Sequence, residues 1–308
     1  MSASTPTLED WIREAAERMD MAGLYFGHGT DNALDEACWL ASSALAMPPD
    51  FDASEFSRGL ESSEIDALDA LLERRIESRM PLAYLLGTAW LAGLEFEVSP
   101  DVLVPRSPIA ELILDGFEPW LSAEQLTRAA DVGTGSGCLA IALARHWPEC
   151  EVDAFDISPP ALELARRNVR RHGLEGRVHV IESDLLSAAG AARYDLILAN
   201  PPYVPSASME SLPAEFLHEP RLGLEAGEDG LDLVRRLLTQ VPAHLSEHGI
   251  LICEVGEAAE ALQALLAPAV EPVWLEFANG GDGVFLLDAE ACRRAAEFLL
   301  DGGRVSTA

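Results

Sequence analysis

From about residue 128 onward, this sequence alternates between two hydrophobic patterns, and the alternation limits its fold more than any other feature. Short apolar runs typical of β-strands are followed by amphipathic segments with helical spacing. Such an alternation predicts a mostly parallel sheet with helices on both faces. The predicted strands cover residues 129–133, 152–156, 178–182, 194–200, 249–255, 272–277 and 283–288. The predicted helices cover residues 137–146, 159–172, 228–247 and 257–268.

Only the segment NGGDG separates the last two predicted strands. This connection is too short for a helical crossover, so we expect the two strands to pair antiparallel at the edge of the sheet. The predicted fold class is therefore α/β. It is a sheet of seven strands, mostly parallel, with an antiparallel edge hairpin.

Residues 1–80 carry a different pattern and are predicted to form a small helical domain. Thr7 and Asp10 fit a capping box at the start of a first helix. A second helix fits residues 31–45. A third, SSEIDALDALLERRIESR, ends before Pro81, because a proline disfavours helical geometry in the residue that precedes it.

Residues 81–104 are predicted to form a β-hairpin linker. Leu94, Phe96 and Val98 alternate with polar residues there, and glycines punctuate the segment. The rest of the chain, residues 105–308, is predicted to form the α/β domain.

Charge is the unusual part of the composition. The chain has 52 acidic residues against 21 basic ones, every basic residue is arginine, and the net charge is −31. Such a chain repels phosphate backbones, so stable nucleic-acid binding is not expected. The acidic surface either keeps the protein in solution at high salt or attracts a basic protein partner, and the two interpretations are compatible.

Targeting and metal-binding patterns are not found in the sequence. No secretory segment and no apolar run of membrane-spanning length occurs, so we expect a cytoplasmic protein that does not contact membranes. The five cysteines are scattered without a C-x-x-C pair, and the seven histidines lack ligand spacing. We therefore expect reduced thiols and no bound metal.

The segment AADVGTGSGCLAIALARHW reads as strand, glycine-rich turn and helix. Gly133, Gly135 and Gly137 allow a sharp turn and a close approach to a ligand, and the N-terminus of the following helix favours negative charge. Cys138 stands where the dinucleotide fingerprint has a third small residue. The pattern favours a ligand with a single carboxylate over a pyrophosphate; the alternative is a tight turn without a ligand.

Two aspartates follow the next two predicted strands. Asp156 can accept hydrogen bonds from the two hydroxyls of a ribose, and Asp184 can accept one from the exocyclic amine of a base. Each alone is more often a helix cap or a solvated loop charge. Together with the glycine turn they describe an amino-acid carboxylate, a ribose and an adenine across three strand ends, which are the parts of S-adenosylmethionine.

The segment LILANPPYVPS ends the fourth predicted strand in an amide, two prolines and an aromatic ring. The side-chain oxygen of Asn200 and the carbonyl of Pro201 can both accept hydrogen bonds from an NH2 group. Pro201 and Pro202 fix the backbone, and Tyr203 offers a flat face to a planar substrate. The segment therefore predicts a site that presents a planar NH2 group to a methyl donor, with a rigid strand-end turn as the alternative.

DVGTGSG, Asp156, Asp184 and NPPY together resemble the class I methyltransferases that act on planar nitrogen, and the resemblance implies their Rossmann-like fold. The segments RMPLAYLLGTAWLAGLEFEVSPDVLVPRSPIAELI and WLEFANGGDGVFLL are similar to those of protein N5-glutamine methyltransferases of the HemK/PrmB type. Release-factor enzymes of that family typically carry a PRPDTE-like segment where this chain has VPRSPIAE. With HEPRLGLEAGEDGLDLVRR and LICEVG, the resemblance is strongest to the PrmB branch, which methylates a glutamine of the third large-subunit ribosomal protein. It covers about residues 79–290 closely.

The resemblance implies a set of site residues. The substrate amide would be bound by Asn200, Pro201, Pro202 and Tyr203. S-adenosylmethionine would be bound by Asp131, Gly133, Thr134, Gly135, Ser136, Gly137, Asp156, Ile157, Asp184, Leu185 and Asn200. Leu185 departs from the aromatic residue that release-factor enzymes tend to carry at its position. Pro105 and Arg106 are predicted to shape the substrate entrance; the alternative for Arg106 is a structural ion pair with an acidic neighbour.

The resemblance implies methyl transfer to a glutamine of a basic ribosomal protein, without a metal or a dedicated general base. A release-factor glutamine methyltransferase and a DNA or RNA adenine-N6 methyltransferase share the same pocket chemistry and remain alternatives. The nucleic-acid enzyme is disfavoured by the charge, because ARRNVRRHG is the strongest basic cluster and fits a solvated helix face. A small-molecule N-methyltransferase leaves the helical domain unexplained, and a non-catalytic binding module leaves the NPPY segment unexplained.

Overall fold

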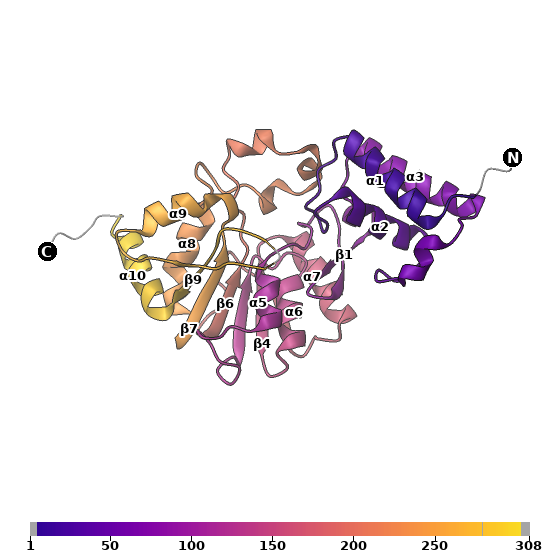
Figure 1. Cartoon of the computed structure of the whole chain (residues 1–308). Coiled ribbons are helices and arrows are strands. Elements are labelled where there is room, and N and C mark those ends of the chain that lie inside the picture. The colour runs from indigo at the N-terminus through magenta and orange to yellow at the C-terminus, as the bar shows by residue number, and fades with distance from the viewer. Residues whose placement is uncertain (1–4, 279, 303–308) are drawn as a thin grey trace. The chain divides into compact units, whose positions relative to one another are not determined.

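The computed structural model describes residues 5–278 and 280–302. By their contacts these residues form two compact units (Figure 1). The first unit holds the chain up to Ala89 together with Pro213–His218, and the second holds Trp90–Leu212 and the chain from Glu219 onward. A six-residue segment of the C-terminal half thus packs with the N-terminal helices.

The first unit is helical, as predicted. Thr7 accepts a hydrogen bond from the backbone N–H of Asp10 over 3.2 Å, and the Thr7 N–H donates to the Asp10 carboxylate over 2.9 Å, which confirms the capping box. The apolar faces of the helices enclose one core that includes Leu8, Met19, Leu40, Leu68 and Leu72. The helical elements are α1 (Leu8–Met21), α2 (Ala33–Ala44), η1 (Ala53–Ser57), α3 (Ser62–Ser78) and α4 (Leu82–Leu86).

The segment Pro213–His218 is bound in the first unit by buried charges. The side chain of Glu215 is completely buried and lies 2.9 Å from the Nε atom of Arg79 and 3.6 Å from Arg75. Arg75 in turn donates from Nε to the buried Glu36 over 2.7 Å. Since an uncompensated buried charge is costly, all four groups depend on one another.

The predicted hairpin linker is present, but it begins later than expected. Strands β1 (Thr88–Leu91) and β2 (Leu94–Glu97) form a two-stranded sheet. The residues before them form helix α4, which the alternating pattern does not reveal. Gly87 ends that helix in the left-handed conformation, with φ +73°.

The second unit is a seven-stranded sheet in the order β5-β4-β3-β6-β7-β9-β8. All neighbouring strands from β5 to β7 pair parallel, whereas β9 pairs antiparallel with both β7 and β8. The predicted mostly parallel sheet with an antiparallel edge hairpin is therefore confirmed. The strands are β3 (Arg128–Val132), β4 (Glu151–Asp156), β5 (Val178–Glu182), β6 (Tyr194–Ala199), β7 (Leu245–Glu254), β8 (Val273–Trp274) and β9 (Val284–Asp288).

Helices cover both faces of this sheet (Figure 1). Alternate residues along a strand point to opposite faces: Ala130 and Ile197 join the core under α8, α9 and α10, while Ala129 and Leu198 join the core under α5 and α6. The α-helices are α5 (Ile109–Asp115), α6 (Cys138–His146), α7 (Pro159–Arg171), α8 (Asp232–Gln240), α9 (Ala259–Leu266) and α10 (Ala289–Leu300). The 3-10 turns are η2 (Ser208–Ser211), η3 (Ala214–His218), η4 (Arg221–Gly223), η5 (Val241–Ala243) and η6 (Gly256–Ala258), of which η3 belongs to the first unit.

The structure departs from the prediction at helix α8, at strand β7 and at helix α10. The helix predicted over 228–247 is shorter, because Gly230 adopts φ +77° before it and Pro242 follows it in a 3-10 turn. Strand β7 therefore begins at Leu245, where it pairs with Tyr194, rather than at residue 249. Helix α10 was not predicted at all. Within the described residues, no helix is both long and apolar enough to cross a bilayer.

Candidate active site

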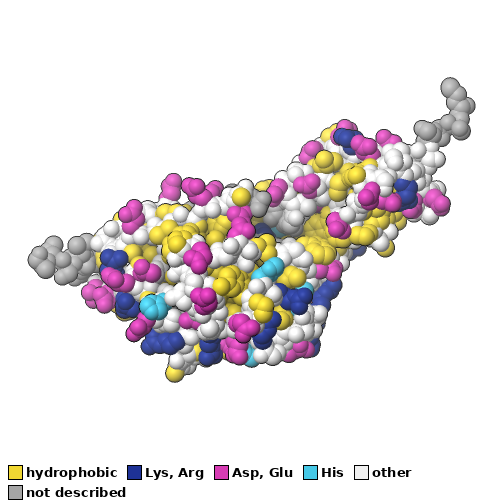
Figure 2. All heavy atoms as spheres, turned by 60° about the horizontal axis from the view of Figure 1, so that its bottom comes forward, with side chains coloured by type: hydrophobic (Ala, Val, Ile, Leu, Met, Phe, Trp, Pro, Cys, Tyr) yellow, Lys and Arg dark blue, Asp and Glu magenta, His cyan; other side chains and the backbone are white. Residues whose placement is uncertain are grey.

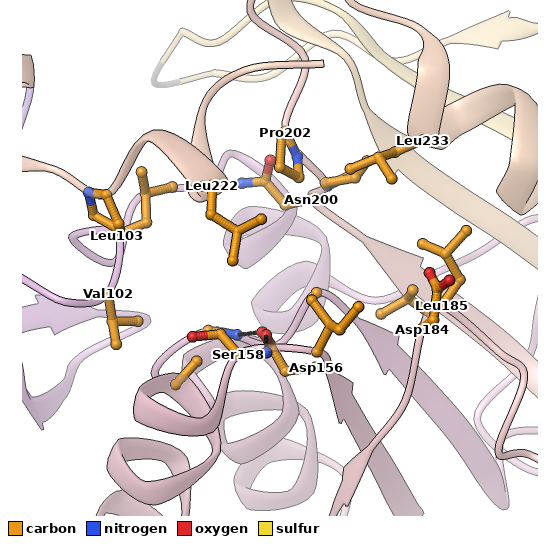
Figure 3. Close-up of a pocket in the computed structure, with 18 of the residues that line it drawn as sticks. Val102, Leu103, Asp156, Ser158, Asp184, Leu185, Asn200, Pro202, Leu222 and Leu233 are labelled. Atoms are coloured by element: carbon orange, nitrogen blue, oxygen red, sulfur yellow. Dashed lines mark hydrogen bonds between the residues drawn. The ribbon is translucent and has the colours of Figure 1, made fainter. Parts of the chain in front are cut away.

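The carboxyl ends of β3, β4, β5 and β6 surround a cavity of about 330 Å³ in the second unit (Figure 3). Its volume lies within the range of small-ligand sites. Open α/β sheets bind ligands beyond the carboxyl ends of their strands, at the point where the strand order changes direction. Here that point is β3, with β4 and β5 on one side and β6 and β7 on the other. The cavity walls include Gly133 after β3, Asp156 at the end of β4, Asp184 after β5 and Asn200 after β6.

The glycine-rich turn after β3 forms the part of the wall nearest α6. The N–H groups of Gly133 and Thr134 both donate to the carbonyl of Phe155 over 2.9 Å, which closes the turn against β4. Gly133, Gly135 and Gly137 have φ values of +76°, +56° and +82°, which residues other than glycine rarely adopt. Gly133 and Gly135 line the cavity, and Gly137 begins helix α6.

Asp131 lies beneath this turn and is nearly inaccessible, with 1% of its surface exposed. Its Oδ2 atom accepts hydrogen bonds from Thr134 Oγ1 over 2.6 Å and from the Ala140 N–H over 3.2 Å. Among the described residues, no donor reaches its Oδ1 atom. Burial raises the pKa of Asp131 to about 6, against the lowering effect of these two hydrogen bonds.

Asp156 connects the glycine turn to the start of α7. Its Oδ2 atom accepts from the Gly135 N–H and its Oδ1 atom accepts from the Ser158 N–H, both over 2.8 Å. The second of these bonds is drawn in Figure 3, below the cavity. Burial raises the pKa of Asp156, and the backbone donors partly offset that effect. The half-buried carboxylate lines the cavity next to Ile157, whose side chain is largely exposed.

Asp184 and Leu185 form the wall beyond β5 (Figure 3). The Nη2 atom of Arg236 donates to Asp184 Oδ2 over 2.6 Å at an exposed position, and Arg236 also lines the cavity. Leu185 has φ +53°, which a leucine rarely adopts. An unusual backbone conformation of this kind is often found at ligand sites.

Asn200, Pro201 and Pro202 line the cavity, and Asn200 and Pro202 lie on the side opposite Asp156 (Figure 3). The Nδ2 atom of Asn200 donates a long hydrogen bond of 3.4 Å to the carbonyl of Arg106. That bond sets the orientation of the amide, so its Oδ1 atom is the one available as an acceptor. Three of the four residues expected to bind the substrate amide are thus together at the cavity.

Tyr203 does not line this cavity. Its hydroxyl donates to Glu254 over 3.1 Å, and its ring packs closely against Gly256. The pKa of Tyr203 is raised first by burial and then by the charge of Glu254. The predicted stacking face for a planar substrate therefore stays a prediction, whereas the anchoring of the ring is a feature of the structure.

Pro105 and Arg106 also lie outside the cavity wall. The two terminal nitrogens of Arg106 donate to the two carboxylate oxygens of Glu219 over 2.6 and 2.7 Å. Glu219 also accepts from the N–H of Val104 over 3.1 Å. The alternative interpretation of Arg106, a structural ion pair, describes this geometry.

Comparison with known proteins assigns a family to this geometry. Residues 117–248 match the family described as Methyltransferase small domain, and residues 10–87 match the PrmC N-terminal domain. The chain is 49% identical to the ribosomal protein uL3 glutamine methyltransferase of Xylella fastidiosa, over 92% of this chain and 90% of that protein. The chain belongs to this glutamine methyltransferase family. The predicted resemblance and its PrmB branch are confirmed.

Other relatives agree. The enzymes of the same name from Xanthomonas campestris pv. campestris and Bordetella pertussis are 48% and 47% identical, over 92% of this chain and 91% and 95% of theirs. The solved catalytic domain of hMettl16, in complex with a MAT2A 3′UTR hairpin, superposes with a TM-score of 0.51. It is 18% identical over 81% of this chain and 90% of its own, and it shows the class I methyltransferase fold alone.

The residues of this family member fit S-adenosylmethionine. Asp131 is buried beneath the glycine turn and does not itself line the cavity, but its Oδ1 atom has no donor among the described residues and would suit the ammonium of an amino-acid group. Asp156 offers carboxylate lone pairs to a ribose, and Leu185 offers an apolar face at the far wall. Gly133 keeps the turn free of a side chain at the cavity. These features match an amino acid, a sugar and a base in that order.

The methyltransferase cavity also contains residues that sequence reasoning missed. Val102, Leu103, Leu222 and Leu233 form part of its apolar lining, and in Figure 3 the Leu222 side chain points into the cavity between Asn200 and Asp156. Val102 and Leu103 belong to the segment PDVLVP, and Leu222 belongs to EPRLG, both in stretches that stand out only by their resemblance to the family. The signal was present in those two segments, but no local pattern directs them to the cavity.

Proposed function

We propose that this chain transfers a methyl group from S-adenosyl-L-methionine to the side-chain amide nitrogen of a glutamine in ribosomal protein uL3. The observation that supports this most is the orientation of Asn200, whose Nδ2 atom is taken by the Arg106 carbonyl. Its Oδ1 atom and the carbonyl of Pro201 remain to accept the two N–H bonds of a substrate amide. The substrate itself is inferred from the uL3 glutamine methyltransferases of 47–49% identity.

Those two acceptors address the main chemical difficulty. An amide nitrogen is a poor nucleophile because its lone pair is delocalised into the carbonyl. Hydrogen bonds from both N–H groups to Asn200 Oδ1 and the Pro201 carbonyl favour electron density on nitrogen and fix the direction of its lone pair. The prolines hold the second acceptor still because their φ angles are restricted. Orientation of this kind removes much of the entropic part of the barrier.

When bound, S-adenosyl-L-methionine supplies an electrophilic methyl group on a sulfonium. Asp131, Gly133 and Gly135 would hold its amino-acid part, Asp156 and Ile157 its ribose, and Asp184 and Leu185 its base. Thr134 holds Asp131 by a hydrogen bond and Gly137 starts α6, so both would act by shaping the turn, as would Ser136 between them. The apolar lining formed by Val102, Leu103, Leu222 and Leu233 would exclude water, which favours a reaction in which positive charge is dispersed.

The charge of the chain suits a ribosomal protein substrate. The net charge is −31, and Figure 2 shows acidic side chains distributed over the visible surface. A protein that binds ribosomal RNA must neutralise phosphates, so we expect it to be basic. Complementary charge increases the association rate of such partners. We propose that the helical unit contributes to binding this substrate. We also propose that the reaction occurs in the cytoplasm.

A methyl-transfer assay tests the proposal directly. Labelled S-adenosylmethionine is offered with purified uL3, with a peptide-release factor and with duplex DNA in parallel reactions. We expect label in uL3, and mass spectrometry should place it on one glutamine whose replacement by alanine abolishes it. Label in the release factor alone would keep the pocket chemistry and refute the substrate. Label in DNA would refute the argument from charge.

A further inference from the structure

A buried carboxylate connects two segments of the active site. Glu254 ends strand β7 with 6% of its surface exposed. Its Oε1 atom accepts the Tyr203 hydroxyl over 3.1 Å, and its Oε2 atom accepts the Ser107 hydroxyl over 2.6 Å. Burial raises the pKa of Glu254, while the two hydroxyl donors and nearby Arg106 lower it. Both oxygens are thus engaged by donors from outside β7.

The two donors belong to the two segments that set the amide acceptors. Tyr203 is three residues after Asn200 in the NPPY segment, so its anchoring limits where the Pro201 carbonyl points. Ser107 directly follows Arg106, whose carbonyl accepts the hydrogen bond from Asn200 Nδ2. One carboxylate is therefore bonded to the segment that carries the acceptors and to the segment that orients the Asn200 amide.

The packing around Tyr203 leaves it little freedom. A Cβ atom on Gly256 would lie 2.5 Å from the Tyr203 ring, and one on Gly230 would lie 2.2 Å from the Tyr203 carbonyl oxygen. Behind Gly256, a Cβ atom on Gly283 would lie 2.3 Å from the Gly256 carbonyl. Glycines at these positions allow the backbone to approach the ring and its carbonyl closely. The hydroxyl of Tyr203 is then directed at Glu254.

We propose that Glu254 is a positioning residue for methyl transfer, which acts through Tyr203 and Ser107 to hold Asn200 Oδ1 and the Pro201 carbonyl where the substrate amide binds. The inference rests on the proposed function and adds a residue to it. It also assigns a role to the segments VPRSP and CEVG, which contribute Ser107 and Glu254, and to Gly283, which packs against Gly256. Glu254 itself does not line the cavity.

The chain contains a matched control for this geometry. Asp153, in the middle of β4, is 5% exposed and accepts from the Tyr194 hydroxyl and from Nη2 of Arg128, each over 2.8 Å. Tyr194 is the first residue of strand β6, whereas Asn200 follows its last residue. This tyrosine–carboxylate pair therefore lies toward the amino ends of the strands, away from the cavity. Removing Asp153 tests what the loss of a buried partner does to the fold alone.

The experiment compares E254A, E254Q, Y203F and the double variant E254A/Y203F with D153A. The readouts are kcat and KM for uL3, the dissociation constant for S-adenosylmethionine by calorimetry, and Tm. We expect E254A to lower kcat by about 100-fold, the loss that follows a small misplacement of reacting groups. Cofactor affinity should be unchanged within about threefold, which is small beside that loss. E254Q should recover part of the rate, since an amide can still pair with both hydroxyls.

Groups that act as a unit have non-additive effects. The double variant should therefore be no slower than the slower of E254A and Y203F, and D153A should lower Tm while retaining kcat. If the wild-type enzyme labels uL3 and E254A has the same kcat, the role of Glu254 is refuted while the proposed function stands. Equal losses of kcat in E254A and D153A, or losses that multiply in the double variant, would refute that role as well. A wild-type enzyme that does not label uL3 would instead refute the proposed function.

Discussion

Arg106 and Glu219 form a two-point ion pair in which each terminal guanidinium nitrogen donates to a different carboxylate oxygen, over 2.6 and 2.7 Å. The Glu219 side chain is completely buried and that of Arg106 is 24% exposed. The pair joins two segments that are far apart in the sequence, and these segments carry Leu103 and Leu222 into the cavity wall. It therefore holds the shape of the proposed site from outside it.

Replacing Arg106 by alanine should destabilise the protein strongly. The change leaves the Glu219 carboxylate buried with its main cationic partner removed, which typically costs about 3–5 kcal/mol. Urea unfolding measures the loss. R13A is the matched control, because Arg13 pairs with Glu9 at the exposed surface, where an ion pair contributes little to stability. Equal losses in the two variants would show that Arg106 contributes no more than a surface pair.

The parts of the site that could be predicted from sequence are those set by local chemistry. Gly133 and Gly135 predict a turn because few other residues adopt positive φ. Asn200 can be placed at a strand end because it follows an apolar run and precedes two prolines. Strand ends of a parallel sheet meet at one edge, so their joint placement follows from the strand pattern alone.

The rest depends on contacts between distant segments. Arg236 reaches Asp184 from α8, and Glu219 meets Arg106 across more than a hundred residues. Glu254 lies in an apolar run that reads only as a strand. No sequence periodicity distinguishes these charged residues from solvent-exposed ones, because their partners come from distant segments that only tertiary packing brings together.

Replacing Asn200 by alanine should separate binding from chemistry. The variant loses the Oδ1 acceptor and the hydrogen bond to the Arg106 carbonyl, so the substrate amide is no longer oriented. We expect kcat for uL3 methylation to fall by at least about 100-fold. Calorimetry should show nearly unchanged affinity for S-adenosylmethionine. Retained transfer by N200A would refute the proposed mechanism, and a lost cofactor affinity would assign Asn200 to cofactor binding.

The raised pKa of Asp131 predicts a stability difference that depends on pH. Its pKa is about 6 in the folded state, against an ordinary value of 3.8 for an aspartate. The unfolded chain therefore loses this proton first as pH rises, and the group destabilises the folded state by about 3 kcal/mol once pH exceeds about 6. The variant D131N removes this effect, provided that its amide oxygen keeps the bonds from Thr134 and Ala140.

Urea unfolding of both proteins from pH 4 to pH 7 tests this sign. The stability of D131N relative to wild type should increase as pH rises through about 4 to 6, and then stay constant. Other carboxylates cancel in the difference. A difference that is flat, or that decreases with pH, would show that burial does not raise the pKa of Asp131. Weaker binding of S-adenosylmethionine by D131N at pH 7 would support the fit of its ammonium to Oδ1.

The acidic composition predicts that salt stabilises the protein. A net charge of −31 makes the folded chain repel itself, and screening shortens the range of that repulsion from about 10 Å at 0.1 M salt to about 3 Å at 1 M. We expect Tm to rise by several degrees between 0.1 and 2 M KCl. The experiment uses a chloride salt because sulfate stabilises most proteins through its exclusion from the protein surface, whatever their charge. A maximum of Tm at low salt would refute salt adaptation and favour attraction of a basic partner.

Gly256 should be intolerant of a side chain for two separable reasons. Its φ of +44° strains any other residue, and a Cβ atom would lie 2.5 Å from the Tyr203 ring. Gly173 isolates the first reason, because it has φ +66° and a Cβ atom added there would meet no atom within 4 Å. We expect G173A to cost about 1–2 kcal/mol of unfolding free energy. G256A should cost about 1–3 kcal/mol more through overpacking, and it alone should lower kcat, because the ring it displaces anchors the NPPY segment. Equal costs and equal activities would show that the Tyr203 ring yields to the methyl group, and that its contact with Gly256 does not hold the amide acceptors.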